Sequence, residues 1–184
     1  LDYVGGVNQV VINLATQMEA AGSYEPIVLI TDWEAPHPIW EVIQGVKAVR
    51  WRVRMLDPGT GFKGKMVFNL WNWRFKRSFR QFCKEYGVAV INPHYPTSTA
   101  FTLSDVTSEA LPKPKIIVSV HGADLTGIQA SGTEGIAQWR DFLAHADAVI
   151  ACSKSLAQRA VDIFGTRIVP IVIHNGVDVE KFVQ

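Results

Sequence analysis

The sequence has few of the features that mark secreted, metal-binding or membrane-spanning proteins. Its 184 residues include two cysteines, Cys83 and Cys152, which lie far apart and without metal-ligand spacing, so we expect neither a disulfide framework nor a metal site. No apolar run approaches the ~18 residues of a membrane span, and no secretory signal opens the sequence. The formal net charge of +1 gives no indication of a nucleic-acid partner. We therefore expect a cytoplasmic protein with reduced thiols.

Short β-branched runs alternate with longer helical patterns along the whole chain, which predicts a parallel sheet with crossover helices. The length fits one domain, 1–184, with an α/β, doubly wound, Rossmann-like sheet of about six strands and helices on both faces. Helices are predicted at 6–22, 65–86, 97–110, 134–146 and 154–164, and strands at 27–31, 46–53, 88–92, 116–121, 147–153 and 168–173.

Two features of the first third qualify this prediction. Side chains alternate along 46–53, with Val49 and Trp51 on one side and Arg50 and Arg52 on the other, which indicates a half-exposed strand near the sheet edge. The first helix of such a fold normally follows a central strand, yet only five residues precede Gly6. We expect that this strand was removed or lies upstream.

The first helix opens with Gly5-Gly6-Val7-Asn8. Paired glycines can adopt positive φ and let a phosphate approach the free N–H groups at a helix start. The alternative is a simple turn before the helix.

Two polar segments follow predicted core strands, at the carboxyl edge where open α/β sheets bind ligands. His121-Gly122-Ala123-Asp124 offers an imidazole to an oxyanion or a sugar hydroxyl, or else places a histidine that caps the strand end and bonds to Asp124. Asn92-Pro93-His94-Tyr95-Pro96 adds a second imidazole and a ring on which a sugar can stack. A proline-bracketed turn explains this second segment as well.

Two later segments complete a recognisable order. Ala146 to Ser153 (ADAVIACS) reads as a strand that ends at a helix N-cap, and Asn175-Gly176 is a turn after the last strand. Together the segments resemble the N-terminal domain of family 4 (group 1) glycosyltransferases of the GT-B fold. The shared features are the Gly-Gly-Val helix, His-Gly-x-Asp, Ala-Asp-x-Val-Ile-Ala-x-Ser, and Asn-Gly-Val-Asp-x-x-x-Phe ending at Phe182.

The resemblance covers nearly the whole chain and implies an enzyme. The implied reaction is that of a retaining, hexosyltransferase-like enzyme, which moves a sugar from a nucleotide-sugar donor to the hydroxyl of a glycan, lipid or small-molecule acceptor. No cofactor and no essential metal are implied. The resemblance assigns Gly5 and Gly6 to the donor diphosphate, His121 to catalysis, and His94, Tyr95 and Asp124 to the acceptor.

The sequence departs from the family pattern in one respect. The family's donor site uses a Glu-x7-Glu pair in its second domain, and no glutamate here has another eight positions later. The resemblance places the domain crossover near Phe182. We therefore expect the acceptor-side half of a GT-B enzyme, with its own C-terminal domain as a partner and without activity alone.

The predicted helix 65–86 combines aromatic and basic residues. Its stripe of Phe68, Trp71, Phe75, Phe79, Phe82 and Tyr86 favours packing on the core, with the cations on a solvated face. Alternatively, the helix rests on the inner face of an anionic membrane, an interpretation that Leu70 and Trp73 keep open because they lie off the stripe.

Two other functions stay open. Some sugar-nucleotide epimerases share the two-domain architecture, but they would need acid–base carboxylates near His121, and only Asp124 is close in sequence. A non-enzymatic module that binds a carbohydrate or a partner protein is the third possibility.

Overall fold

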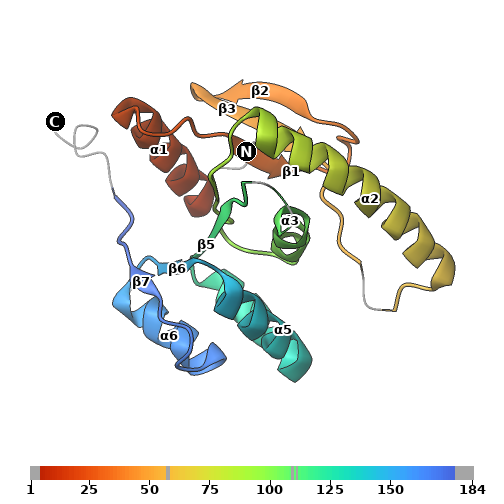
Figure 1. Cartoon of the computed structure of the whole chain (residues 1–184). Coiled ribbons are helices and arrows are strands. Elements are labelled where there is room, and N and C mark those ends of the chain that lie inside the picture. Colours follow the sequence, from red (N-terminus) through yellow and green to blue (C-terminus); the bar gives the residue numbers. More distant parts are fainter. Residues whose placement is uncertain (1–4, 57–58, 109, 111, 177–184) are drawn as a thin grey trace.

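The structure is a computed structural model that describes residues 5–56, 59–108, 110 and 112–176. Helices and strands alternate along it, and the parallel strands are flanked by helices (Figure 1). The elements are α1 (Gly6–Ala21), β1 (Val28–Thr31), β2 (Ile39–Ile43), β3 (Val46–Trp51), α2 (Phe62–Glu85), β4 (Val90–Ile91), α3 (Thr99–Thr107), β5 (Lys115–Val120), α4 (Ala123–Ala130), α5 (Gly132–His145), β6 (Ala148–Ala151), α6 (Lys154–Phe164) and β7 (Ile171–Val172).

The second half of the chain forms a parallel sheet with the strand order β4-β5-β6-β7. Each strand is joined to the next through helices, namely α3, the pair α4 and α5, and α6. This is the predicted succession of parallel strands and crossover helices. Because all four strands run the same way, their carboxyl ends lie at one edge of the sheet.

The first third forms a separate three-stranded sheet with the order β1-β3-β2. β1 and β3 are parallel, whereas β2 and β3 form an antiparallel hairpin. β2 was not predicted. The prediction that 46–53 lies near a sheet edge is wrong, because β3 lies between β1 and β2. The prediction of one sheet with about six strands is corrected to seven strands in two sheets within the described residues.

Two buried apolar clusters hold these layers together. In the first, Val118 of β5 packs with Leu125 of α4 and Phe164 of α6. In the second, Trp51 of β3 contacts Phe75 of α2, with ring centroids 5.3 Å apart. Ile91 of β4 packs against both clusters, so the strand that begins the parallel sheet also contributes to the core under α2.

The local signals for helix ends were accurate. α1 begins at Gly6 and is capped by Gly22 in the left-handed conformation, and Ser153 accepts a hydrogen bond from the Leu156 N–H at the start of α6. The core stripe of the aromatic helix is confirmed in its middle, since Phe75 and Phe79 are buried and Trp71 and Phe82 pack against them, whereas Tyr86 is 43% exposed. The short helix α4 was not predicted.

Candidate functional site

Two histidines meet at the carboxyl ends of β4 and β5. His121 follows β5 directly, and His94 lies just beyond β4, where it forms a parallel bridge with Ser119. His94 Nδ1 is 3.1 Å from His121 Nε2, and the two rings are stacked with centroids 5.3 Å apart. The structure therefore joins the two polar segments that the sequence placed at this edge.

The backbone of β5 holds His94 in place. The Ser119 N–H donates to the Pro93 carbonyl at 3.0 Å, and the Tyr95 N–H donates to the Ser119 carbonyl at 3.2 Å. The Ser119 hydroxyl donates to Asn92 Oδ1 at 3.0 Å. Ser119 was not among the predicted site residues, although a hydroxyl inside the apolar run of β5 was a visible signal.

Tyr95 occupies the outer side of this edge. Its φ of 51° is unusual for a residue with a side chain, and the side chain is 40% exposed. The phenol is therefore accessible to a ligand that reaches the histidine pair.

Asp124 is bonded to the backbone at the end of β5, close to the alternative that the sequence left open for this segment. The residue is 4% exposed, and its carboxylate accepts hydrogen bonds from the backbone N–H groups of His121, Gly122 and Leu125 at 2.6–3.2 Å. It thus ties the end of β5 to the start of α4. Acceptor binding by Asp124 stays a prediction, and this geometry favours a positioning role.

Gly122 makes the turn between His121 and α4. Its φ is 115°, a conformation that residues with a Cβ rarely adopt. A Cβ added there would meet only Leu156 at 3.8 Å, so backbone conformation rather than space selects glycine.

Burial favours the neutral form of both histidines. Burial lowers the pKa of His94 to about 4, and the neighbouring His121 acts in the same direction. Burial also lowers the pKa of His121, although the Asp124 carboxylate opposes this. In a neutral pair one ring donates to the other, so the two remaining ring nitrogens offer one N–H donor and one acceptor. A sugar hydroxyl, which both donates and accepts, matches this set.

Gly5 and Gly6 begin α1 as predicted, but without positive φ. Gly5 has φ −104°, and Gly6 is the first residue of the helix. Gly5, the residue at the N-cap, has no side chain that could cap this helix start, and a Cβ added at Gly6 would meet nothing within 4 Å. Contact of Gly5 and Gly6 with a donor diphosphate stays a prediction.

The last predicted segment is only partly described. His174 Nδ1 lies 3.0 Å from the Cys152 carbonyl oxygen, and Asn175 and Gly176 are exposed. Val177, Asp178 and Phe182 of the resemblance lie outside the described residues.

Two clefts lie away from the histidine pair. A cleft of about 580 Å³ runs along α2, and one of about 330 Å³ lies between α2 and α3; neither is lined by His94 or His121. Within the described residues, no group of three or more His, Cys, Asp or Glu could hold a metal ion. In the same residues no helix is long and apolar enough to cross a membrane.

Comparison with known proteins agrees with this architecture. The family model described as Glycosyltransferase Family 4 matches residues 4–181. A solved structure of sucrose-phosphate synthase from Thermosynechococcus elongatus superposes with a TM-score of 0.52 at 16% identity, covering 94% of this chain and 88% of that one. No curated protein matched the sequence. At that identity the structural match shows the fold, which is the Rossmann-like half of a GT-B arrangement.

Proposed function

The chain belongs to glycosyltransferase family 4, and we propose that it forms the acceptor side of a retaining hexosyltransferase. The enzyme would move a sugar from a nucleotide-sugar donor to a hydroxyl of a glycan, lipid or small molecule. The donor nucleotide would bind to a domain outside residues 1–184, because these residues contain no Glu-x7-Glu pair.

The observation that supports this proposal best is the neutral histidine pair at the carboxyl edge. His94 and His121 come from different strands and are held 3.1 Å apart. Their burial favours neutral rings, which can bind an uncharged hydroxyl without the cost of desolvating a charge.

Each predicted site residue has a role in the proposal. His121 contacts the transferred sugar at the reaction centre, while His94 and the exposed ring of Tyr95 bind the acceptor. Gly5 and Gly6 approach the donor diphosphate, since the N–H groups at a helix start attract an anion and neither glycine has a side chain to obstruct it. Asp124 positions the His121–Gly122 turn.

The remaining parts of the proposal concern conditions. Transfer needs no cofactor and no essential metal, and the enzyme works in the cytoplasm, where Cys83 and Cys152 stay reduced. An epimerase is disfavoured, because the nearby carboxylate of Asp124 already accepts hydrogen bonds from three backbone N–H groups.

The test is a glycosyl-transfer assay with a panel of nucleotide sugars and acceptors. The chain is assayed alone and within the longest polypeptide that its gene encodes. We expect turnover in the longer protein only, and we expect His121→Ala to lower kcat by about 100-fold, the effect of removing one hydrogen-bond donor at a reacting group.

His145→Ala is the matched control, since His145 is exposed on α5 and bonds to Asp141 of the same helix. Turnover of His121→Ala within a factor of two of the parent would remove His121 from the reaction centre. Transfer by the chain alone would overturn the placement of the donor site.

A further inference from the structure

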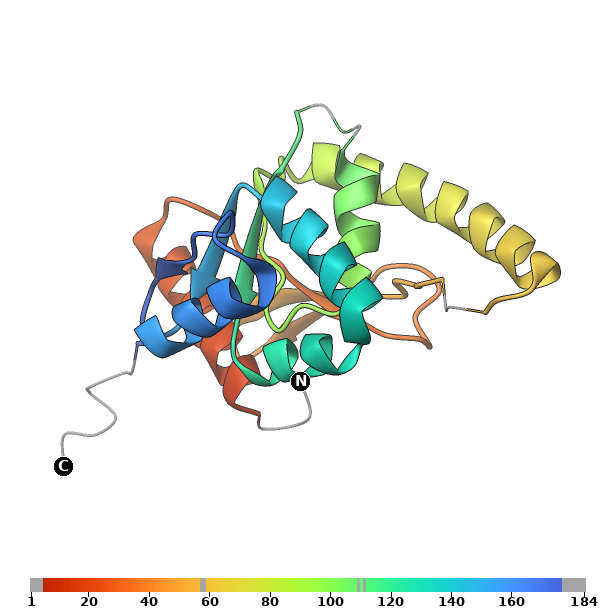
Figure 2. The ribbon, with the colours of Figure 1, turned by 90° about the horizontal axis from the view of Figure 1, so that it is seen from below.

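The beginning of α2 has an apolar face that the rest of the described molecule leaves uncovered. Phe62, Met66, Leu70 and Trp73 recur at steps of four, four and three, so they share one side of the helix. Their exposed fractions are 78%, 58%, 55% and 61%. Figures 1 and 2 show this end of α2 extending beyond the two sheets.

The other half of α2 behaves in the opposite way. Phe75, Phe79 and Cys83 are buried against β3 and α3. Trp73 and Phe75 are only two positions apart in the sequence, yet one ring faces outward and the other lies in the core. The exposed stripe is therefore an additional face of α2, distinct from the aromatic stripe that packs inward.

Cations border the exposed stripe on both sides. At 3.6 residues per turn, Lys63 and Arg74 lie along one flank, and Lys65 and Lys76 along the other. The helix contains seven of the eighteen Lys and Arg residues and one of the seventeen Asp and Glu residues. The net charge of α2 is therefore +6. Because the whole chain has a net charge of +1, the residues outside α2 carry −5.

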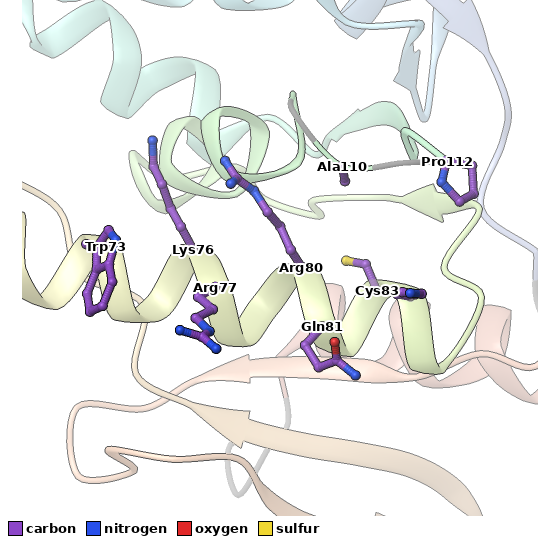
Figure 3. A pocket seen from close by; sticks show the side chains of 9 residues that line it. Trp73, Lys76, Arg77, Arg80, Gln81, Cys83, Ala110 and Pro112 are labelled. Carbon is purple, nitrogen blue, oxygen red and sulfur yellow. The ribbon is translucent and has the colours of Figure 1, made fainter.

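The apolar stripe leads into a basic groove of about 580 Å³. Figure 3 shows Trp73 at one end of the groove, Arg77 next to it, and Ala110 and Pro112 on the opposite wall. Lys76 is paired with Asp105 at 2.6 Å. Arg77 and Lys84 are exposed and have no acidic partner among the described residues, so both are available to anions.

We propose that this outer surface of α2, defined by Phe62, Met66, Leu70, Trp73 and the cations Lys63, Lys65, Arg74, Arg77 and Lys84, docks on an anionic lipid bilayer. The helix lies in the plane of the interface, with its apolar stripe among the upper acyl chains and its cations among the phosphates. A second copy of the chain is a poor occupant, because two such helices would bring like charges together.

The test is cosedimentation of the purified chain with phospholipid vesicles. We expect binding to vesicles of phosphatidylcholine mixed with phosphatidylglycerol at low salt, weaker binding at high salt, and little binding to phosphatidylcholine alone. The double variant Leu70→Ser/Trp73→Ser should bind at least about tenfold more weakly, since two apolar side chains no longer enter the lipid.

Two controls match these variants. Trp33→Ser removes a tryptophan that is 62% exposed, close to the 61% of Trp73, but on the loop between β1 and β2 rather than on α2, and it should bind like the parent. Lys63→Gln/Arg74→Gln should bind to the anionic vesicles about five-fold more weakly for each cation removed. Lys154→Gln on α6 should not change binding. Circular dichroism checks that every variant is folded.

Three results would overturn the proposal. The first is no binding to anionic vesicles at low salt, and the second is equal binding by the parent and both double variants. The third is self-association in the absence of lipid that Leu70→Ser/Trp73→Ser abolishes, because the stripe would then be an interface between copies of this chain.

Discussion

The carboxyl edge of β4 and β5 and the outer surface of α2 are both rich in polar groups, but they are organised in opposite ways. At the edge His94 and His121 bond to each other, and the buried Asp124 carboxylate accepts hydrogen bonds from the backbone. On α2 the cations are mostly exposed and surround uncovered apolar side chains. Substitutions at the edge should therefore change stability as well as chemistry, whereas substitutions on the outer surface of α2 should change binding alone.

Among substitutions at the carboxyl edge, the largest effect on stability is expected at Asp124. Asp124→Ala leaves three backbone N–H groups, those of His121, Gly122 and Leu125, without their acceptor, which should lower the free energy of unfolding by about 3 kcal/mol. Asp124→Asn keeps one carbonyl oxygen as an acceptor and should cost about 1 kcal/mol. Urea denaturation at pH 7 measures both.

Asp141→Ala serves as the control, because its side chain is 82% exposed and should change stability by no more than about 0.5 kcal/mol. Equal losses at Asp124 and Asp141 would mean that the carboxylate does not hold the His121–Gly122 turn. The carboxyl edge of β4 and β5 would then be no more sensitive to substitution than an exposed surface.

A smaller effect is expected from pH. Between about pH 6.5 and pH 4 the unfolded chain protonates His94, while the folded chain keeps it neutral because burial lowers its pKa to about 4. The unfolded state therefore binds more protons in this window, and stability falls as the pH is lowered through it. His94 should contribute a loss of about 2 kcal/mol between pH 7 and pH 4.5, and His121 acts in the same direction.

The measurement is urea denaturation of the parent and of His94→Gln at both pH values. Carboxylates contribute to both proteins alike, so the difference between the two pH dependences isolates His94 and its coupling to His121. The variant should show the flatter dependence. A parent and a variant with the same pH dependence would show that His94 is as easily protonated in the fold as outside it.

Much of the fold could be predicted because its signals are local. A glycine at the left-handed end of α1 and a serine at the start of α6 specify helix ends without reference to distant residues. β2 gave no such signal, since apolar and polar residues do not alternate along Ile39–Ile43. Ile39, Trp40 and Val42 are all exposed in the structure. Its turn, Gln44-Gly45, has φ of 50° and 87°, a conformation that Asn-Gly announces more clearly than Gln-Gly does.

The candidate site was predictable as a region but not as a set of contacts. Strand direction alone places the segments after β4 and β5 at the same edge. The bond between His94 and His121 depends on the register of β4 against β5, which the Ser119 hydrogen bonds set. Asp124 appears available in the sequence because α4 is short and was not foreseen; once that helix begins at Ala123, the carboxylate has backbone partners.

The smallest effect is expected at Trp73, and it sharpens the comparison within a single helix. Trp73→Ser removes a ring that is 61% exposed, so the free energy of unfolding should change by no more than about 0.5 kcal/mol. Phe75→Ala removes a ring that is 3% exposed and contacts Trp51, and it should cost about 4 kcal/mol. Urea denaturation of the two variants measures both, and turnover on a water-soluble acceptor should be unchanged in Trp73→Ser.

A loss of stability at Trp73 as large as that at Phe75 would show that the outer stripe is covered in solution and contributes to the stability of the fold. A near-zero change, with binding to anionic vesicles lost, would leave lipid contact as the reason for an apolar stripe that the fold does not need.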